Sequence, residues 1–190
     1  MTVTFRTDLF AGGVALVVGG TTGIGAATAD ALAMLGAVVT VTGDINLTGT
    51  MRCCTAARAK LKARPGAAGG AIVNLASMLS FQAGGTVPAY SASKGGVVQL
   101  TKALAIAYAA DGVRVNAVAP GWVKTALTQP LQDDAQRSAA ILARTPLGRW
   151  AEPADVADAV VFLCSPAAVS SRGLCSPSTA GIPLRSADRP

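Results

Sequence analysis

The chain has 190 residues, which fits a single domain. It is 51% apolar and 14% charged and contains no histidine, which excludes histidine-based triads, histidine general bases and histidine-containing zinc sites. The formal net charge is +6, and a basic run spans residues 52–64. That run could bind nucleic acid, but no aromatic residue is interleaved with it. A solvated helix face is the simpler interpretation, and we expect no nucleic-acid partner.

Cysteine spacing and hydropathy bear on metal sites and compartment. The four cysteines lack metal-ligand spacing, so we expect no metal site and reduced thiols. No apolar run reaches the ~18 residues of a membrane span. Residues 9–20 are short, broken by glycine, and lack the layout of a signal peptide. We therefore expect a cytoplasmic protein with no membrane partner.

Patterning predicts alternating strands and helices. Residues 14–18 are continuously apolar, residues 26–35 have helical spacing, and residues 37–42 are rich in β-branched residues, which together indicate a βαβ unit. Such alternation predicts a Rossmann-like α/β fold, a doubly wound parallel sheet with helices on both faces. Further along, we expect strands at 71–75 and 113–118 and helices at 47–64, 88–110, 134–143 and 153–164.

A glycine-rich turn, GGTTGIG over residues 19–25, joins the first strand to the first helix. Glycines let the backbone approach a pyrophosphate, and the helix N-terminus offers free N–H groups and partial positive charge. This turn therefore predicts a dinucleotide site, although a tight turn without a ligand is the alternative. Asp44 follows the second strand with no Arg or Lys after it, which favours NAD over NADP.

The stretch YSASK places Tyr90 one helical turn before Lys94, and Ser77 lies 13 residues before Tyr90, just past the strand at 71–75. A free tyrosine has a pKa of ~10. A neighbouring ammonium favours the phenolate and lowers that pKa, so Tyr90 could exchange a proton with an alcohol or carbonyl. Ser77 could hold the substrate oxygen. Taken alone, the Tyr–Lys pair is better explained as part of an ordinary helix face.

Several segments, in order along residues 12–165, resemble the short-chain dehydrogenase/reductase family. The resemblance implies that Tyr90 is the acid/base, that Lys94 tunes it and holds the nicotinamide ribose, that Ser77 orients the carbonyl, and that Asn46 supports a proton relay. It also implies that residues 77–87 and 125–147 line the substrate pocket. The matching segments are VVGGTTGIG, INLTG, IVNLAS, PAYSASKGG, RVNAVAPGWVKT and GRWAEPADVADAVVFL. The residues implied to bind cofactor are Gly19, Gly23, Ile24, Gly25, Asp44, Tyr90, Lys94, Val123 and Thr125.

The chain departs from this family in its middle. The family has two more strands and two more helices where VTVTGD here runs straight into INLTG. We therefore expect a shortened sheet that lacks the family's third and fourth strands. Such a sheet would either close the gap or leave the first strand with unpaired backbone groups, each costing ~1–3 kcal/mol if buried.

The C-terminal segment departs as well. We expect a truncated dinucleotide-binding domain over residues 1–168, then an irregular, disordered tail over 169–190 in which the family's last strand is lost. Permitted codons for VSSRGLCSPSTAGI, read from the third base, give FVTGAVLPVDGGY, which is the family's ending. We hypothesise a frameshift just before Val169.

Two functions remain open from the sequence. One is an NAD(P)-dependent oxidoreductase that acts on a small alcohol or ketone. The other is a catalytically inactive remnant with weak or no cofactor binding. Family members usually associate through the two helices that carry Asn46 and Tyr90, so we expect a homodimer if the chain folds.

Overall fold

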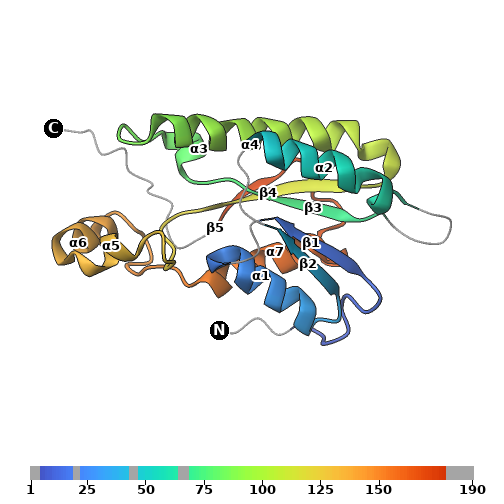
Figure 1. The fold of residues 1–190 in the computed structure, drawn as a ribbon, viewed down its shortest axis with the longest axis horizontal. Helices are drawn as coiled ribbons and strands as arrows, with labels where there is room; N and C mark the ends of the chain where they lie inside the picture. The colour runs from blue at the N-terminus through green and yellow to red at the C-terminus, as the bar shows by residue number, and fades with distance from the viewer. Residues whose placement is uncertain (1–4, 19–21, 43–46, 64–68, 179–190) are drawn as a thin grey trace.

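The computed structural model describes residues 5–18, 22–42, 47–63 and 69–178 (Figure 1). The strands and helices alternate as the sequence predicts, and every strand pairing is parallel. The elements are β1 Val14–Val18, α1 Gly23–Met34, β2 Val38–Thr42, α2 Leu47–Leu61, β3 Ala71–Leu75, α3 Leu79–Gln82, α4 Pro88–Ala107, η1 Ala109–Asp111, β4 Arg114–Pro120, α5 Gln129–Asp133, α6 Ala135–Ala143, α7 Pro153–Cys164, η2 Pro166–Ala168 and β5 Cys175–Ser178.

The described strands form two sheets instead of one. One sheet has the order β1-β2 and the other β3-β4-β5. Of the two outcomes expected for a shortened sheet, the structure has the open one, because β1 and β3 are not paired. The fold is thus a shortened Rossmann-like α/β fold, as predicted.

Helices cover the larger sheet on both faces. Figure 1 shows α2, α3 and α4 on one side of β3 and β4, and α1 and α7 on the other. The two helices α1 and α7 pack against each other extensively. Because α1 also packs on β1 and β2 while α7 packs on β3 and β4, this helix pair joins the two sheets.

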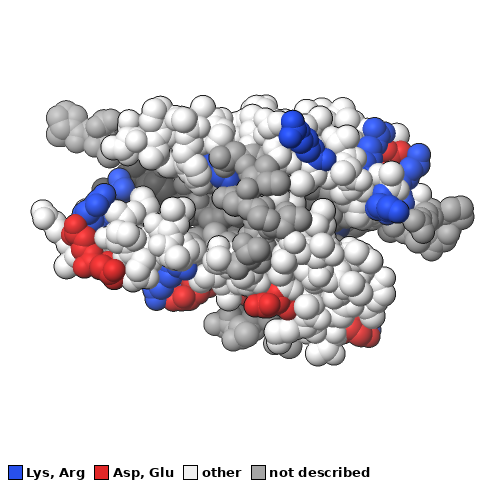
Figure 2. Space-filling model, in the orientation of Figure 1, with Lys and Arg blue, Asp and Glu red and all other residues white. Residues whose placement is uncertain are grey.

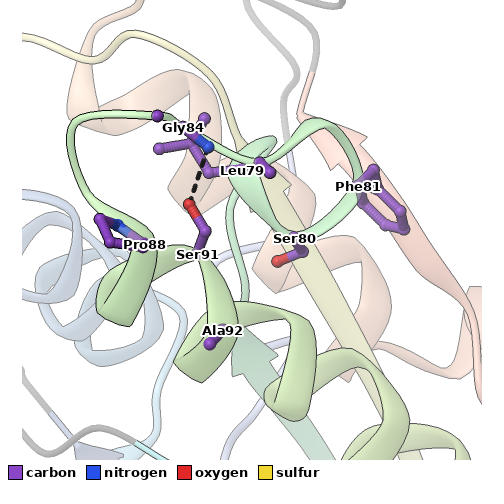
Figure 3. A pocket seen from close by; sticks show the side chains of 9 residues that line it. Leu79, Ser80, Phe81, Gly84, Pro88, Ser91 and Ala92 are labelled. Carbon is purple, nitrogen blue, oxygen red and sulfur yellow. Dashed lines mark hydrogen bonds between the residues drawn. The ribbon is translucent and has the colours of Figure 1, made fainter.

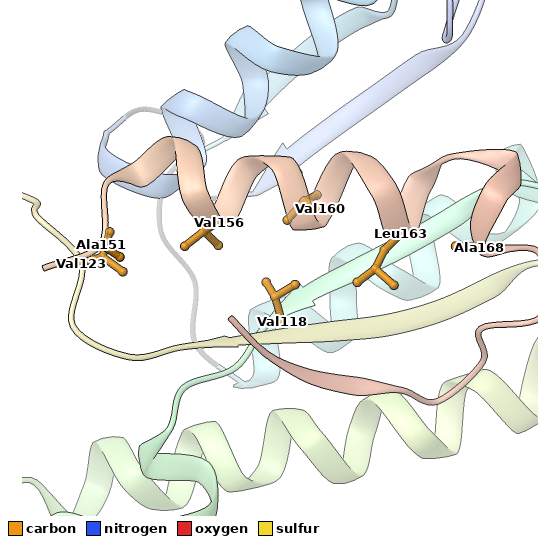
Figure 4. Close-up of a cluster of buried hydrophobic side chains, with 7 residues drawn as sticks. All are labelled: Val118, Val123, Ala151, Val156, Val160, Leu163 and Ala168. Atoms are coloured by element: carbon orange, nitrogen blue, oxygen red, sulfur yellow. The ribbon is translucent and has the colours of Figure 1, made fainter. Parts of the chain in front are cut away.

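The core is centred on β4, whose seven residues are all buried. On one face, Val118 and Val123 meet Val156, Val160 and Leu163 of α7 (Figure 4). The opposite face packs on α4. A strand buried on both faces must be continuously apolar, which is what RVNAVAP nearly is.

The two polar exceptions in β4 anchor the end of the described chain. The Arg114 guanidinium donates to the carbonyl oxygens of Leu163, Cys164, Ser165 and Ala168 at 2.6 to 3.3 Å, which satisfies the C-terminus of α7. Asn116 has no exposed surface and bonds the backbone of the segment before β5, accepting from the Leu174 N–H at 3.1 Å.

This anchoring corrects one expectation. The sequence predicted no last strand and an irregular segment from residue 169 onward, yet residues 175–178 form β5, which pairs in parallel with β4. Hydrogen bonds from Asn116 to Ser171 and Leu174 hold the segment before β5 in place. The sequence of β5 lacks the apolar pattern from which a strand would be predicted. Residues 179–190 lie outside the described residues, and the division into 1–168 and 169–190 stays a prediction.

Candidate active site

Tyr90 and Lys94 lie on the same face of α4 as the residues that pack on the sheet, but closer to the start of the helix. Thr101, Val97 and Val98 on this helix are buried against the strands, and Lys94 and Tyr90 continue the same face at helical spacing. Pro88 starts the helix at a position where proline's missing N–H costs nothing. This face therefore places both candidate residues at the carboxyl end of β3, where parallel α/β sheets bind ligands.

Lys94 lies between the tyrosine ring and the end of a strand. Its Nζ is 5.7 Å from the centre of the Tyr90 ring, within the range of a cation–π contact. The same Nζ donates to the Leu75 carbonyl oxygen at 2.8 Å. Tyr90 is 41% exposed, so a ligand can reach it. The structure thus places an ammonium group beside a phenol that a ligand can reach.

Ser77 lies on the loop that leaves β3, two residues past Leu75. Its Oγ accepts the Leu79 N–H at 3.2 Å, and its own N–H donates to Ser80 Oγ at 3.2 Å. These bonds start the short helix α3, which the sequence did not predict. Because Oγ here uses only a lone pair, its proton can still be donated to a substrate oxygen.

The glycine turn and the loop after β4 meet. Gly23 has φ +54°, and a Cβ built on it would lie 3.0 Å from Thr125 Cγ2. This contact brings together two regions that the resemblance assigned to the same cofactor. Gly25 lies within α1, and no described side chain caps the α1 N-terminus. The first N–H groups of α1 therefore fit an anionic group.

The structure gives Ile24 and Val123 packing roles. Val123 is 4% exposed and lies in the cluster with α7, and Ile24 packs against that cluster. The backbone around Val123 is held on both sides, since Thr128 Oγ1 donates to its carbonyl oxygen at 2.6 Å and the Lys124 N–H donates to the Ala151 carbonyl. Any contact of Val123 with a cofactor would therefore be through its backbone. Gly19, Asp44 and Asn46 lie outside the described residues.

A pocket of about 430 Å³ lies between α3, the loop after it and the first turns of α4 (Figure 3). Ser91 Oγ accepts the Gly84 N–H at 2.9 Å across it. No charged side chain lines it, and Tyr90 and Lys94 lie on another face of α4. Its lining residues are Leu79, Ser80, Phe81, Ala83, Gly84, Gly85, Pro88, Ser91 and Ala92.

The sequence missed the Leu75 carbonyl as a member of this site. Side-chain motifs do not reveal backbone acceptors, but an edge strand that ends beside a lysine is a signal that could have found it. Among the described residues no group of three or more Cys, Asp or Glu could hold a metal, and no helix is long and apolar enough to cross a membrane.

The described residues form a parallel α/β protein with a tyrosine–lysine pair at the carboxyl end of β3 and a glycine-rich segment between β1 and α1. The enoyl-(acyl carrier protein) reductase family model matches residues 41–175. The chain belongs to the short-chain dehydrogenase/reductase family, as its motifs indicated.

Curated relatives match part of the chain. A 2-dehydro-3-deoxy-D-gluconate 5-dehydrogenase of Bacillus subtilis is 52% identical over 96 residues, which is 50% of this chain and 38% of the relative. A cis-4-hydroxycyclohexanecarboxylate dehydrogenase of Sinomonas cyclohexanicum is 44% identical over 125 residues, 66% of this chain and 48% of the relative. The matches thus span less than half the length of these relatives.

Solved structures match the fold more broadly. A structure from Beutenbergia cavernae, assigned as an NAD(P)-dependent gluconate 5-dehydrogenase and holding NADP at low occupancy, is 31% identical with a TM-score of 0.76, covering 92% of this chain and 98% of that one. A structure from Agrobacterium tumefaciens, assigned as a 2-deoxy-D-gluconate 3-dehydrogenase and also with bound NADP, is 30% identical with a TM-score of 0.74, covering 91% of this chain and 97% of that one.

Proposed function

We propose that this chain is an NAD(P)-dependent oxidoreductase that interconverts a small alcohol and its ketone. The observation that carries the proposal is the position of Lys94 between the exposed Tyr90 ring and the Leu75 carbonyl at the carboxyl end of β3. Ser77 follows Leu75 by two residues. The segments that follow β1 and β4 also meet, through the contact between Gly23 and Thr125.

Each residue has one proposed role. Ser77 Oγ donates a hydrogen bond to the substrate oxygen and fixes its position. Tyr90 Oη gives that oxygen a proton during reduction and takes it back during oxidation. The Lys94 ammonium stabilises the phenolate left behind. Asn46 is proposed to support proton exchange with solvent.

The cofactor is proposed to lie over the glycine turn. Its diphosphate would bind at the uncapped start of α1, with Gly23 leaving the space that a side chain would fill against Thr125. The nicotinamide supplies or accepts the hydride. The two structural relatives above bind NADP, while Asp44 favours NAD, so the choice between them stays a prediction.

Cofactor binding is the first test. We expect NADH or NADPH to raise the melting temperature in a saturable way and to change nicotinamide fluorescence. A ligand that binds only the native state stabilises it by ~2.7 kcal/mol at a hundredfold excess over Kd. A cooperative melt with no shift up to millimolar cofactor would contradict the proposal.

Turnover is tested by Tyr90→Phe, with Tyr108→Phe as the matched control. Tyr108 is the chain's other tyrosine; it is 4% exposed and lies under the Arg58 guanidinium. In a screen of secondary alcohols, we expect Tyr90→Phe to lower kcat by ~10²–10⁴ while leaving the cofactor Kd unchanged. Equal activity of the two variants would remove Tyr90 from the mechanism.

An inactive remnant is the second candidate, and the split sheet favours it. Among the described strands, β1 has a partner only in β2, and β1 leads directly into the glycine turn that is proposed to hold the cofactor. This candidate predicts a folded chain that binds cofactor weakly or not at all and shows no turnover with any alcohol tested.

We also propose a homodimer through α2 and α4. Gly96 of α4 lets Leu47 of α2 approach closely, so the two helices form one surface. Ile106 on α4 is 80% exposed and Met51 on α2 is 42% exposed. Light scattering should give a dimer that Ile106→Glu converts to a monomer. A wild-type monomer would contradict this proposal.

A further inference from the structure

The two sheets are the halves of one interrupted sheet. Both are wholly parallel, and the α1–α7 pair packs across them as a single layer. Figure 1 shows β1 and β3 on the same side of that layer. No described strand lies between them. Among the described strands, β1 and β3 therefore each have one side without a partner, and the break in the sheet between them is called the gap below.

On β1, the hydrogen-bonding register shows which backbone groups face the gap. The Val38 N–H donates to the Gly13 carbonyl at 2.8 Å, and Val14 is paired in register with Val38. In a parallel ladder, alternate residues point both backbone groups to the same side. Residues 13, 15 and 17 thus bond to β2, and Val14, Leu16 and Val18 direct their N–H and C=O groups toward the gap.

The same reasoning applies to β3. The Arg114 N–H donates to the Gly70 carbonyl at 3.0 Å, and the Ala76 N–H donates to the Val118 carbonyl at 2.8 Å. Residues 70, 72, 74 and 76 therefore face β4. The N–H and C=O groups of Ala71, Val73 and Leu75 face away from β4. Lys94 bonds one of them, the Leu75 carbonyl.

Within their own sequences, β1 and β3 carry none of the usual protection against pairing, although Lys94 bonds the Leu75 carbonyl of β3. Protected edges usually carry a charge, a proline or a bulge, and the sequence VALVV of β1 has no charge or proline. Val14 is 74% exposed and Leu16 is 47% exposed, which leaves apolar surface beside backbone groups that have no partner strand among the described residues. On β3, Leu75 is 39% exposed, although β4 next to it is fully buried.

We propose that the gap between β1 and β3 is an acceptor site for a β-strand supplied by another polypeptide. The occupant is an extended segment of about five uncharged, mainly β-branched residues that runs parallel to both edges. Backbone groups on two sides select a polypeptide, and the apolar flanks select an uncharged segment. The 96 residues matched in the Bacillus subtilis relative are 38% of it, so that relative is about 60 residues longer than this chain. A longer chain has room for an additional strand, and in this protein a separate polypeptide segment can supply that strand.

Binding of the strand would also reach Lys94, an inference that rests on the proposed function. A parallel strand beside β3 would donate an N–H to the Leu75 carbonyl that Lys94 now bonds. The ammonium would then be available for Tyr90 and the cofactor. We therefore expect the strand to tighten NADH binding.

The test uses three labelled peptides with uncharged strand sequences of the chain itself, residues 14–18, 38–42 and 71–75, each flanked by lysines for solubility. We expect at least one to bind the full chain saturably by fluorescence anisotropy and to raise its melting temperature. The same peptide with its central residue N-methylated should bind at least tenfold more weakly. If none of the three binds at concentrations up to a millimolar, the proposal is wrong.

Leu16→Pro and Leu16→Ala form a matched pair of variants. Proline at 16 removes an N–H that faces the gap and leaves the β1–β2 ladder intact, whereas alanine keeps that N–H. We expect Leu16→Pro to lose peptide binding at least tenfold more than Leu16→Ala, with similar circular dichroism. Equal binding would place the peptide elsewhere and overturn the proposal.

Two further readouts separate the remaining outcomes. If light scattering shows self-association that Leu16→Pro abolishes, a second copy of this chain is the occupant and the proposed separate segment is wrong. If peptide binds but the NADH affinity is unchanged, the acceptor site stands and the link through Lys94 fails. Because anisotropy needs no cofactor, failure of the proposed function leaves the test of the site intact.

Discussion

Gly23 is the residue at which backbone conformation and the candidate cofactor site coincide. Its φ of +54° lies in the left-handed region, which disfavours residues with a Cβ by roughly 1–2 kcal/mol. Thr125 Cγ2 fills the space where that Cβ would be. One glycine thus serves both the turn after β1 and the approach of the loop after β4.

Gly23→Ala can be compared with Gly12→Ala, because Gly12 has φ +75° but nothing lies within 4 Å of the position that its Cβ would take. Both variants should lose stability from the backbone strain, and Gly23→Ala should lose more. Only Gly23→Ala should raise the NADH Kd, by roughly tenfold or more, because it displaces Thr125. Urea unfolding and cofactor titration of both variants check this. An equal NADH Kd in both would separate the turn from the cofactor site.

Asp111 is the acid that joins the end of α2 to η1. Lys62 and Arg58 bond its two carboxylate oxygens at 2.9 and 2.6 Å and hold its pKa below the usual range. Figure 2 shows this place as a group of basic side chains with an acidic patch among them. The basic run of residues 52–64 is therefore used in part for folding.

The lowered pKa of Asp111 gives stability a pH dependence. A carboxylate with a lowered folded-state pKa stabilises the fold above its unfolded value of ~3.9, and this contribution is lost as pH falls through the folded-state pKa. We expect the melting temperature to fall in acid more steeply for wild type than for Asp111→Asn. The partners are exposed, so 0.5 M salt should reduce the difference. Parallel pH profiles would contradict the assignment.

At the scale of elements, Arg114 connects β4 to the end of α7 and to the segment that leads to β5 through hydrogen bonds. Its guanidinium bonds four carbonyl oxygens at the end of α7 and in η2, and burial lowers its pKa. Helices end with unsatisfied carbonyls, and here a buried cation satisfies them. The last described strand depends on this connection, because the chain turns there toward β4.

Arg114→Met keeps the aliphatic stem but leaves the four carbonyls without their donor. Each buried group that loses its partner costs ~1–3 kcal/mol, so we expect a loss of at least ~2 kcal/mol in urea unfolding. Arg172→Met is the control, since Arg172 is exposed and makes one bond at 3.3 Å to the Val113 carbonyl. Similar losses in both variants would deny Arg114 its special role.

For the whole molecule, the split sheet predicts uneven stability. β4 is paired on both sides and buried, whereas β1 pairs only with β2 among the described strands. Local opening needs less free energy where fewer contacts are lost. Native-state hydrogen exchange should show the amides of residues 114–118 as the most protected. Those of residues 14–18 should exchange at least tenfold faster, and uniform protection would mean that the two sheets open as one unit.

The reading frame of the gene is a second prediction at this scale. The hypothesis of a shift just before Val169 is tested by the coding DNA, in which one single-base change of frame should restore FVTGAVLPVDGGY. A DNA sequence with no such frame would reject it. The structure adds that the present residues 175–178 form a strand all the same.

The sequence by itself determined the alternation of strands and helices, the family and the Tyr90–Lys94 pair. These depend on local spacing: apolar runs for strands, a period near 3.6 for helices, and four residues for one helical turn. The tertiary structure alone decided that β1 and β3 stay apart, that Lys94 bonds the Leu75 carbonyl, and that β5 forms. Strand pairing and backbone acceptors join segments far apart in the chain, and a local pattern carries no record of which edge meets which.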